Sequence, residues 1–365
     1  MTTIKEIINQ VQSELGLAQS ANIIGSSDNM TAQFLSLLER TALEVKDRAD
    51  WQELSGQVSY TMFATTLAGT TVAGLSTITG IASTATLRPG FTVNGSAFNS
   101  STTAQGTNVR IVSVDSATQV TVSRAADNSA TAADFVFAQD RYSLPGDFDH
   151  SLYDTFWQQS QRWKMIGPLT PAEWELRKNG IVAAYPIKRF RIFGKQDAKL
   201  SIDAPPLTSD NGAMFVFEYL SRNIFRPAGW VASQSYNAGS YCSLDGNIYS
   251  TTTGGTSGMV SPRHTSGSAS DGGVTWTYYS DPYDRALADT DECVFSRDII
   301  EPGLKFRFLK AKRLKYDDYE ADYKDALEAG ISKVRGASIV NMAGQSFTRF
   351  IDGASIPDTG YGVAS

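Results

Sequence analysis

Six basic residues fall within eleven positions toward the C-terminal end of the chain: Lys305, Arg307, Lys310, Lys312, Arg313 and Lys315. Such a density of cations could contact the phosphates of DNA or the carboxylates of another protein surface. On a helix these side chains would spread over more than one face, and the apolar residues between them need burial. The run is therefore a candidate wall of a DNA channel or a candidate subunit interface, with plain solvation as the third interpretation.

A second group consists of four large aromatic residues in a stretch rich in Gly, Ser and Thr: Trp230, Tyr241, Tyr249 and Trp276. Aromatic rings can form a stacking platform for the C–H faces of sugar rings, so these residues are a candidate carbohydrate site. A module of about fifty residues, however, needs its large aromatics for its own core. Core packing is the favoured interpretation of this group.

The sequence contains few residues that could bind a metal ion or catalyse a reaction. The only histidines are His150 and His264, and both are expected at the surface. The carboxylates fall into two clusters that lack the spacing of a calcium-binding EF-hand loop, namely Asp147, Asp149 and Asp154, and Asp281, Asp284, Asp289, Asp291 and Glu292. We therefore expect no enzyme activity, no metal and no cofactor.

Composition indicates a large globular protein. The chain has 365 residues, a formal net charge of -6 and two cysteines, Cys242 and Cys293. This length favours two or three domains, and the cysteines are too few for a disulfide framework. The first residues show no signal-peptide pattern and no apolar run is long enough to cross a bilayer, so synthesis in a cytoplasm is expected.

The elements predicted from periodicity alternate between two compositions. Helices are expected after the Thr3 and Glu6 capping box, after Ser27 and Asp28, and over 151–163, 170–176, 301–314 and 317–334. Strands are expected over 51–63, 190–193, 199–202 and 214–220. The residues between 65 and 133 carry few charges and contain several short alternating runs, which predict a β-sandwich rather than a low-complexity linker.

We therefore predict an α+β multidomain fold. Its body is a helical bundle with a small antiparallel sheet, interrupted by two all-β modules. The body covers 1–62, 140–228 and 281–335, the β-sandwich covers 63–139, and the aromatic module covers 229–280. Residues 336–365 are expected to form a tail that becomes ordered on a partner.

Several motifs of the body resemble the head-to-tail adaptor proteins of tailed bacteriophages, the connector or tail tubular protein A-like family. They are Tyr142 to Phe148, Asp154 to Trp157, Arg162-Trp163, Ile166 to Pro171, Glu173-Trp174, Phe217 to Tyr219, Phe306 to Lys312 and Asp317 to Leu327. The resemblance covers the body and neither insert. The inserts resemble the immunoglobulin-like and chitin-binding-like modules that decorate virion proteins.

This resemblance implies a structural virion protein at the head-tail junction. Its subunits would form a ring, typically a dodecamer, between the portal protein and a tail tube or nozzle protein, and would help to retain the packaged DNA that passes through the lumen. No membrane contact is expected. The C-terminal tail would dock on the portal through apolar anchors: Ile339, Val340, Met342, Phe347, Phe350 and Ile351. The alternative function is a carbohydrate-binding decoration or tail-spike component that uses the aromatic module.

Overall fold

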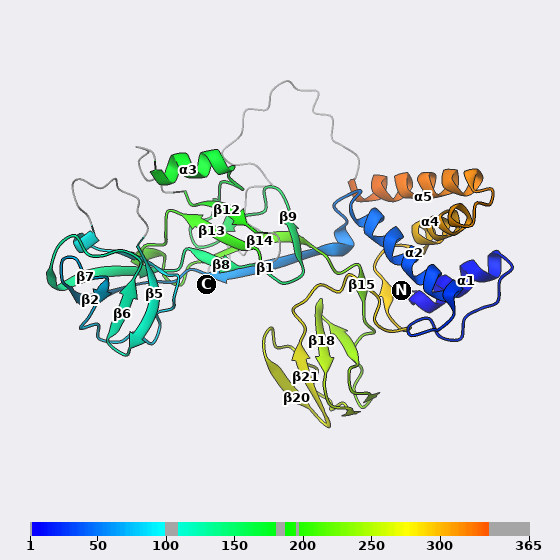
Figure 1. The fold of residues 1–365 in the computed structure, drawn as a ribbon, viewed down its shortest axis with the longest axis horizontal. Coiled ribbons are helices and arrows are strands. Elements are labelled where there is room, and N and C mark those ends of the chain that lie inside the picture. Colours follow the sequence, from blue (N-terminus) through cyan, green and yellow to red (C-terminus); the bar gives the residue numbers. More distant parts are fainter. Residues whose placement is uncertain (1, 99–108, 180–186, 195–196, 336–365) are drawn as a thin grey trace, which may run out of the picture.

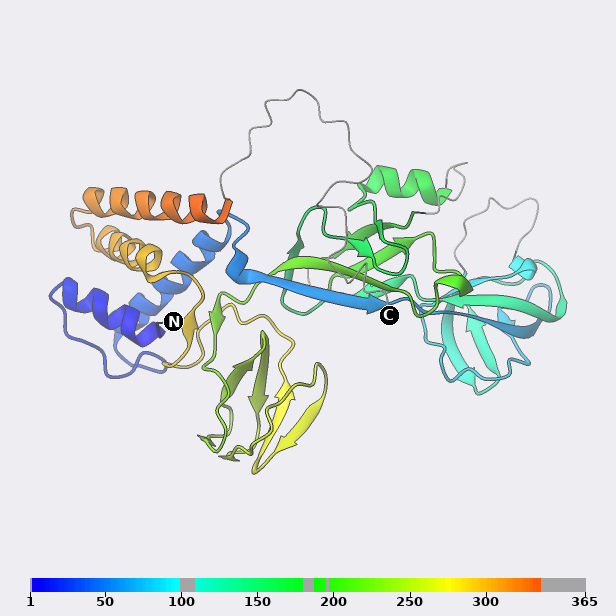
Figure 2. The same ribbon diagram turned by 180° about the vertical axis from the view of Figure 1, so that it is seen from behind.

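The computed structural model of the chain describes residues 2–98, 109–179, 187–194 and 197–335. Figures 1 and 2 show an elongated molecule in which helices gather at one end and a β module forms the other. A pair of long strands runs between these ends, and a second β module lies to one side. Among the described residues, none of the helices combines the length and the apolar character needed to cross a bilayer.

The helical unit consists of α1 (Ile4–Glu14), α2 (Asn29–Lys46), α4 (Arg297–Ala311) and α5 (Asp317–Arg335). The predicted capping box opens α1, since the Thr3 hydroxyl accepts the Glu6 N–H and the Glu6 carboxylate accepts the Thr3 N–H. Asp28 caps α2 by accepting backbone N–H groups of the first turn. These caps satisfy donors that have no partner within the helix, so both helices begin where the sequence predicts.

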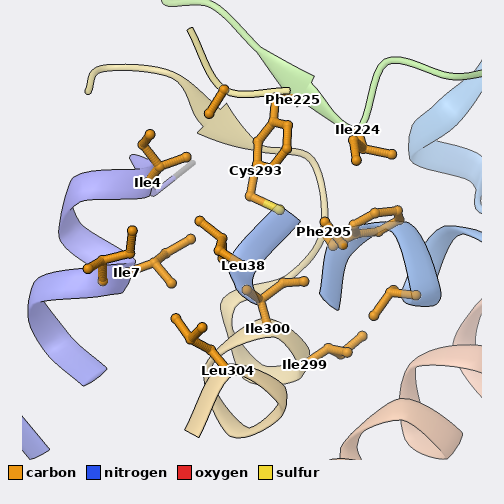
Figure 3. Close-up of a cluster of buried hydrophobic side chains, with 14 of the residues drawn as sticks. Ile4, Ile7, Leu38, Ile224, Phe225, Cys293, Phe295, Ile299, Ile300 and Leu304 are labelled. Atoms are coloured by element: carbon orange, nitrogen blue, oxygen red, sulfur yellow. The ribbon is translucent and has the colours of Figure 1, made fainter. Parts of the chain in front are cut away.

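One apolar core holds the helical unit together. Figure 3 shows its centre, where buried side chains converge from three helices and from the short strands β15 (Phe225–Arg226) and β22 (Glu292–Cys293): Ile4, Ile7, Leu38, Ile224, Phe225, Cys293, Phe295, Ile299, Ile300 and Leu304. The backbone N–H of Ile4 also donates to the carbonyl of Asp291, at 2.8 Å. The unit is therefore assembled from segments of the chain that are nearly 300 residues apart in sequence.

The prediction of a helical-bundle body is wrong. Strand residues outnumber helical ones, 32% against 25%, and the described chain contains five α-helices among several small antiparallel sheets. The segment 151–163, predicted to be helical, contains the end of β9 (Phe148–Ser151), β10 (Trp157–Gln158) and the start of β11 (Trp163–Lys164). Burial alternates there, with Phe156 and Gln158 inside and Trp157 partly exposed. Asp154 and Arg162 have φ of 68° and 54°, which a right-handed helix does not accommodate.

The body between the two inserts is instead a pair of facing β-sheets. In the first sheet, β1 (Ser55–Thr61) pairs with β14 (Met214–Ser221), and β14 also pairs with β9 and β10. The second sheet has the order β12 (Arg189–Phe193), β13 (Lys199–Asp203) and β8 (Arg141–Ser143). The Phe156 ring stacks on Phe190 at 3.7 Å and on Phe217 at 4.1 Å between ring centroids. Helix α3 (Pro171–Asn179) contacts the second sheet through Trp174, which packs edge-on against Phe193.

The first insert is a single closed sheet rather than two packed sheets. Its strand order is β2-β7-β4-β5-β6-β3, and the backbones of Thr70 and Thr79 exchange hydrogen bonds that join the two edges. The bounds of these strands are β2 (Ala64–Thr71), β3 (Thr77–Ile78), β4 (Thr92–Asn94), β5 (Val109–Ser116), β6 (Gln119–Val122) and β7 (Ala130–Ala138). The insert is thus a small barrel, and closure removes the free edges that an open sheet would expose.

The second insert is a four-stranded antiparallel sheet with a short hairpin-like pair beside it. The sheet has the order β17 (Tyr241–Leu244), β18 (Asn247–Thr251), β21 (Val274–Tyr278) and β20 (Ser268–Asp271). The small pair joins β16 (Ser235–Tyr236) to β19 (Gly255–Thr256). Each of the two inserts has a hydrophobic cluster of its own. The second insert also contributes Ile248 to the core of the helical unit.

Truncation of Phe217 tests the core between the facing sheets. We expect Phe217→Ala to lower the free energy of unfolding by about 3–5 kcal/mol, because the ring is fully buried against Phe156. The matched control is Glu218→Ala, whose side chain points to the exposed face of the same strand and should change stability by less than about 0.5 kcal/mol. Chemical denaturation followed by circular dichroism measures both, and equal losses would contradict this placement of the core.

Candidate functional site

A groove on the helical unit brings together α2, α4 and α5. It encloses about 710 Å³ and is lined by side chains of all three helices: Leu37, Arg40, Glu44, Arg48, Phe306, Arg307, Lys310, Ala311, Glu320, Tyr323, Lys324, Leu327, Glu328 and Ile331. Five of these residues are basic and three are acidic, so the groove carries excess positive charge in a chain that is acidic overall. This charge distinguishes the groove from an ordinary seam between helices.

The floor of the groove is aromatic. Tyr323 of α5 stacks on Phe306 of α4, with ring centroids 6.1 Å apart. The two helices approach closely because position 303 is a glycine: a Cβ there would lie 2.8 Å from the Tyr323 ring. The Tyr323 side chain is only 4% exposed as a result.

Two arginines share one carboxylate, that of Glu44, at the side of the groove formed by α2. Arg48 Nη2 donates to Glu44 Oε1 at 2.9 Å, and Arg307 Nη2 donates to the other Glu44 oxygen. Burial lowers the pKa of Arg307, and the neighbouring positive charge of Arg40 lowers it further. A single carboxylate cannot satisfy all the donors of two guanidinium groups, each of which has five N–H bonds, and Arg40 adds a third positive charge nearby. The site therefore retains positive charge that an anionic group could neutralise.

Two polar atoms of the groove are buried and have no hydrogen-bond partner: the Tyr323 hydroxyl and Arg307 Nε. Burial is also the main cause of the raised pKa of Tyr323. A buried polar atom without a partner costs about 1–3 kcal/mol. A polar group supplied by another molecule would recover this cost, which makes the groove a candidate binding surface.

The basic run identified in the sequence is distributed over several faces. Lys305 pairs with Glu14 of α1, and Lys315 pairs with Asp318 at 3.1 Å. The Lys310 ammonium lies over the rings of Phe306 and Tyr316, and Lys312 lies over Phe308. Arg313, with a φ of 57°, follows the end of α4. Of the six residues only Arg307 and Lys310 line the groove, and contact of the run with DNA stays a prediction.

Helix α2 contributes residues to this site that were not predicted from the sequence. Arg40, Glu44 and Arg48 are spaced at i, i+4 and i+8, which places them on one face of a helix. That spacing was a usable signal for a charged stripe. The contact of Glu44 with Arg307, which is 263 residues away in the sequence, could not be predicted from local pattern.

The aromatic residues of the second insert form its interior. Tyr249 and Trp276 are fully buried, which confirms the core interpretation for these two residues. The indole N–H groups of Trp230 and Trp276 both donate to Asp271 Oδ2, at 2.9 and 3.1 Å. Tyr241 packs edge-on against Tyr279 and Tyr283. A sugar ring arriving from solvent therefore finds neither Tyr249 nor Trp276 exposed for stacking.

The carboxylates that resembled metal or acid–base clusters hold segments of the chain together. Asp147 accepts hydrogen bonds from Tyr219, Ser221 and Asn223, and Asp289 accepts the backbone N–H groups of Ile23 and Ile24. Within the described residues, no group of three or more His, Cys, Asp or Glu side chains is placed to hold a metal ion. The six proposed portal anchors, Ile339 to Ile351, lie outside the described residues.

His150 lies at the joint between the helical unit and the first sheet. Its Nδ1 is 2.9 Å from Asp149 Oδ2 and its Nε2 is 3.3 Å from Asp50 Oδ1, while Lys46 Nζ is 2.9 Å from Asp149 Oδ1. The hydrogen bond to Asp149 raises the pKa of His150, and the same bond lowers the pKa of Asp149 to about 2. Below the pKa that His150 has in the unfolded chain, its charged ring contributes its full stabilisation to the fold. This stabilisation is lost as the pH rises through the raised pKa of the folded chain. That of Asp149 is present above its unfolded pKa and is lost as the pH falls through about 2.

Comparisons of the chain with models of protein families, with curated proteins and with solved structures found no match.

The contact between His150 and Asp149 can be tested by NMR titration of the imidazole. We expect the imidazole of His150 to titrate above pH 6.5, and Asp149→Asn to lower its pKa because the strongest acceptor of the charged ring is removed. Asp154→Asn is the control, since Asp154 pairs with Lys164 and should leave His150 unchanged. An Asp149→Asn variant in which His150 titrates as before would contradict the assigned contact.

Removal of the Tyr323 hydroxyl tests whether this buried oxygen lacks a hydrogen-bond partner. We expect Tyr323→Phe to leave the free chain equally stable or to stabilise it by about 1 kcal/mol, because the substitution removes a buried oxygen that lacks a partner. Tyr319→Phe on the same helix is the control, since Tyr319 is 39% exposed and its hydroxyl can be solvated. Urea denaturation measures both variants. A loss of 1 kcal/mol or more in Tyr323→Phe alone would mean that the hydroxyl already has a partner.

Proposed function

We propose that this chain is a structural virion protein, a head-to-tail adaptor that forms a ring between the portal and the tail and helps to retain packaged DNA. The observation that carries the proposal is the groove between α2, α4 and α5, which contains buried polar atoms without partners and five basic residues against three acidic ones. Such a surface is incomplete in the isolated chain. Its chemistry suits assembly with another macromolecule.

The architecture supports the same proposal in two ways. The motifs that resemble phage adaptors lie on the body, and the motif from Phe306 to Lys312 contributes Phe306, Arg307, Lys310 and Ala311 to the groove. The first insert has its own core at the far end of the molecule from the helical unit. An insert in that position can project from a ring without occupying the groove.

The first insert can be removed at a defined point. The backbone N–H of Gln139 donates to the carbonyl of Phe63 at 2.9 Å, so the two ends of the insert already lie side by side. A two-residue Asn-Gly turn can replace residues 64–138 across this pair. Because removal also deletes Arg110, which holds the buried Asp140 through two bonds of 2.7 Å, the variant should include Asp140→Asn.

Docking on portal particles tests the proposed function. Purified protein is mixed with phage heads that carry an exposed portal and the particles are imaged by negative-stain electron microscopy. We expect a ring of density at one vertex for the intact chain and for the chain without residues 64–138, and none for the chain truncated after residue 335. Retention of the truncated chain would show that the C-terminal segment is dispensable. Absence of vertex density for the intact chain, together with retention on a glycan array, would favour the carbohydrate-binding alternative instead.

A further inference from the structure

Helix α5 carries a row of carboxylates on the face that points away from the groove. Asp318, Asp322 and Asp325 are spaced at i, i+4 and i+7, so they share one side of the helix, and all three are exposed. The groove is lined by other positions of the same helix, including Tyr323, Leu327 and Ile331. At 3.6 residues per turn, the acidic row lies on the opposite side of α5 from these residues.

The arginines at the side of the groove form a row of similar length. Arg40 and Arg48 are eight residues apart on α2, which corresponds to about 12 Å along the helix, and Asp318 and Asp325 are separated by about 10.5 Å. Arg307 lies beside the first row and approaches both Arg40 and Glu44. The two rows are similar in length. The arginine row, with three guanidinium groups beside the single carboxylate of Glu44, has a net charge opposite to that of the acidic row.

The surroundings of the two rows suit close packing of helices. The exposed side chains beside the acidic row include Ala321 and Ala329, which are small enough to let another helix approach. The arginine row is flanked by Leu43, which is 43% exposed, and by the partly buried Leu37. An incoming helix would therefore meet an apolar strip as well as guanidinium groups.

We propose that the groove binds the acidic face of α5 from a second copy of this chain. Because the two complementary surfaces lie on different sides of one molecule, the contact is head-to-tail, and repetition of it produces a ring when the rotation closes. The carboxylates of the incoming helix neutralise Arg40 and Arg48, and its polar atoms can supply a partner to Tyr323 or Arg307. The closed ring rests on the proposed function. The contact between two copies of the chain rests on the structure alone.

The charge distribution favours a second copy over other occupants. The arginine row has Glu44 within it and Glu320 and Glu328 nearby, which would repel the continuous negative charge of a DNA backbone. A short row of carboxylates is enough to balance this groove, because its basic residues exceed its acidic ones by only two. The chain itself supplies such a row at the right spacing.

Charge reversal of each surface tests the contact in the full-length chain without portal. Sedimentation velocity over a range of concentrations should show self-association of the native chain that weakens as salt is added. We expect Asp322→Lys/Asp325→Lys and Arg40→Glu/Arg48→Glu each to weaken self-association by about tenfold or more. An equimolar mixture of the two variants should recover association, because each then offers the other a complementary surface. The control Asp281→Lys/Asp284→Lys makes the same charge change at exposed positions outside both rows and should behave as the native chain.

The outcomes separate this inference from the proposed function. A native chain that stays monomeric at all concentrations, or an acidic-row variant that associates normally, overturns the contact. If only the Arg40→Glu/Arg48→Glu variant is affected and it also loses binding of duplex DNA, the groove is a phosphate site and the contact is overturned. If the charge reversals behave as expected but the native chain places no density on portal vertices, the contact stands and the adaptor function fails.

Discussion

The antiparallel pairing of β1 with β14 is the constraint on which the rest of the structure depends. Its register runs without a break from Ser55 opposite Leu220 to Thr61 opposite Met214. β1 leaves the helical unit directly after α2, and β14 returns toward it, so the pair holds the helical unit and the first insert at opposite ends. Closing a long loop costs only slightly more entropy than closing a shorter one, since the cost grows with the logarithm of length. An entire barrel can therefore interrupt the chain between these two strands.

Three buried or half-buried carboxylates connect segments that the pairing of β1 with β14 does not hold together. Asp140 holds Arg110 of the first insert, Asp147 holds the end of β14 through Tyr219 and Ser221, and Asp289 holds the loop before α2. Each of these contacts joins segments that are at least 30 residues apart. A carboxylate that accepts several hydrogen bonds within the fold is positioned by them and has few lone pairs left for a metal or a substrate. Within the acidic clusters of the sequence, Asp147 and Asp289 therefore serve to join segments of a discontinuous body.

Local pattern predicted the elements whose stabilising contacts are local. The Thr3 and Glu6 box fixes the start of α1, and the alternation around Val58 and Tyr60 marks β1. The stripe through Tyr316, Tyr319, Tyr323, Leu327 and Ile331 predicts α5, although Tyr319 is 39% exposed. It failed over 151–163, where a helix was predicted, because the position of Phe156 depends on contacts with Phe190 and Phe217 on strands distant in sequence. It also assigned two sheets to the first insert, because the contact between Thr70 and Thr79 that closes a single sheet has no signature in composition.

The same division applies to the candidate site. The cation density around Arg307 was visible in the sequence, but whether each cation faces solvent, an aromatic ring or a carboxylate depends on the helices that pack beside α4. Glu14 from α1 neutralises Lys305, whereas Glu44 from α2 must serve two arginines at once. The excess charge of the groove is therefore a property of how α1, α2, α4 and α5 pack and of no single segment. Because the same packing buries the Tyr323 hydroxyl without a partner, the interactions that stabilise the helical unit also create the surface that another molecule can complete.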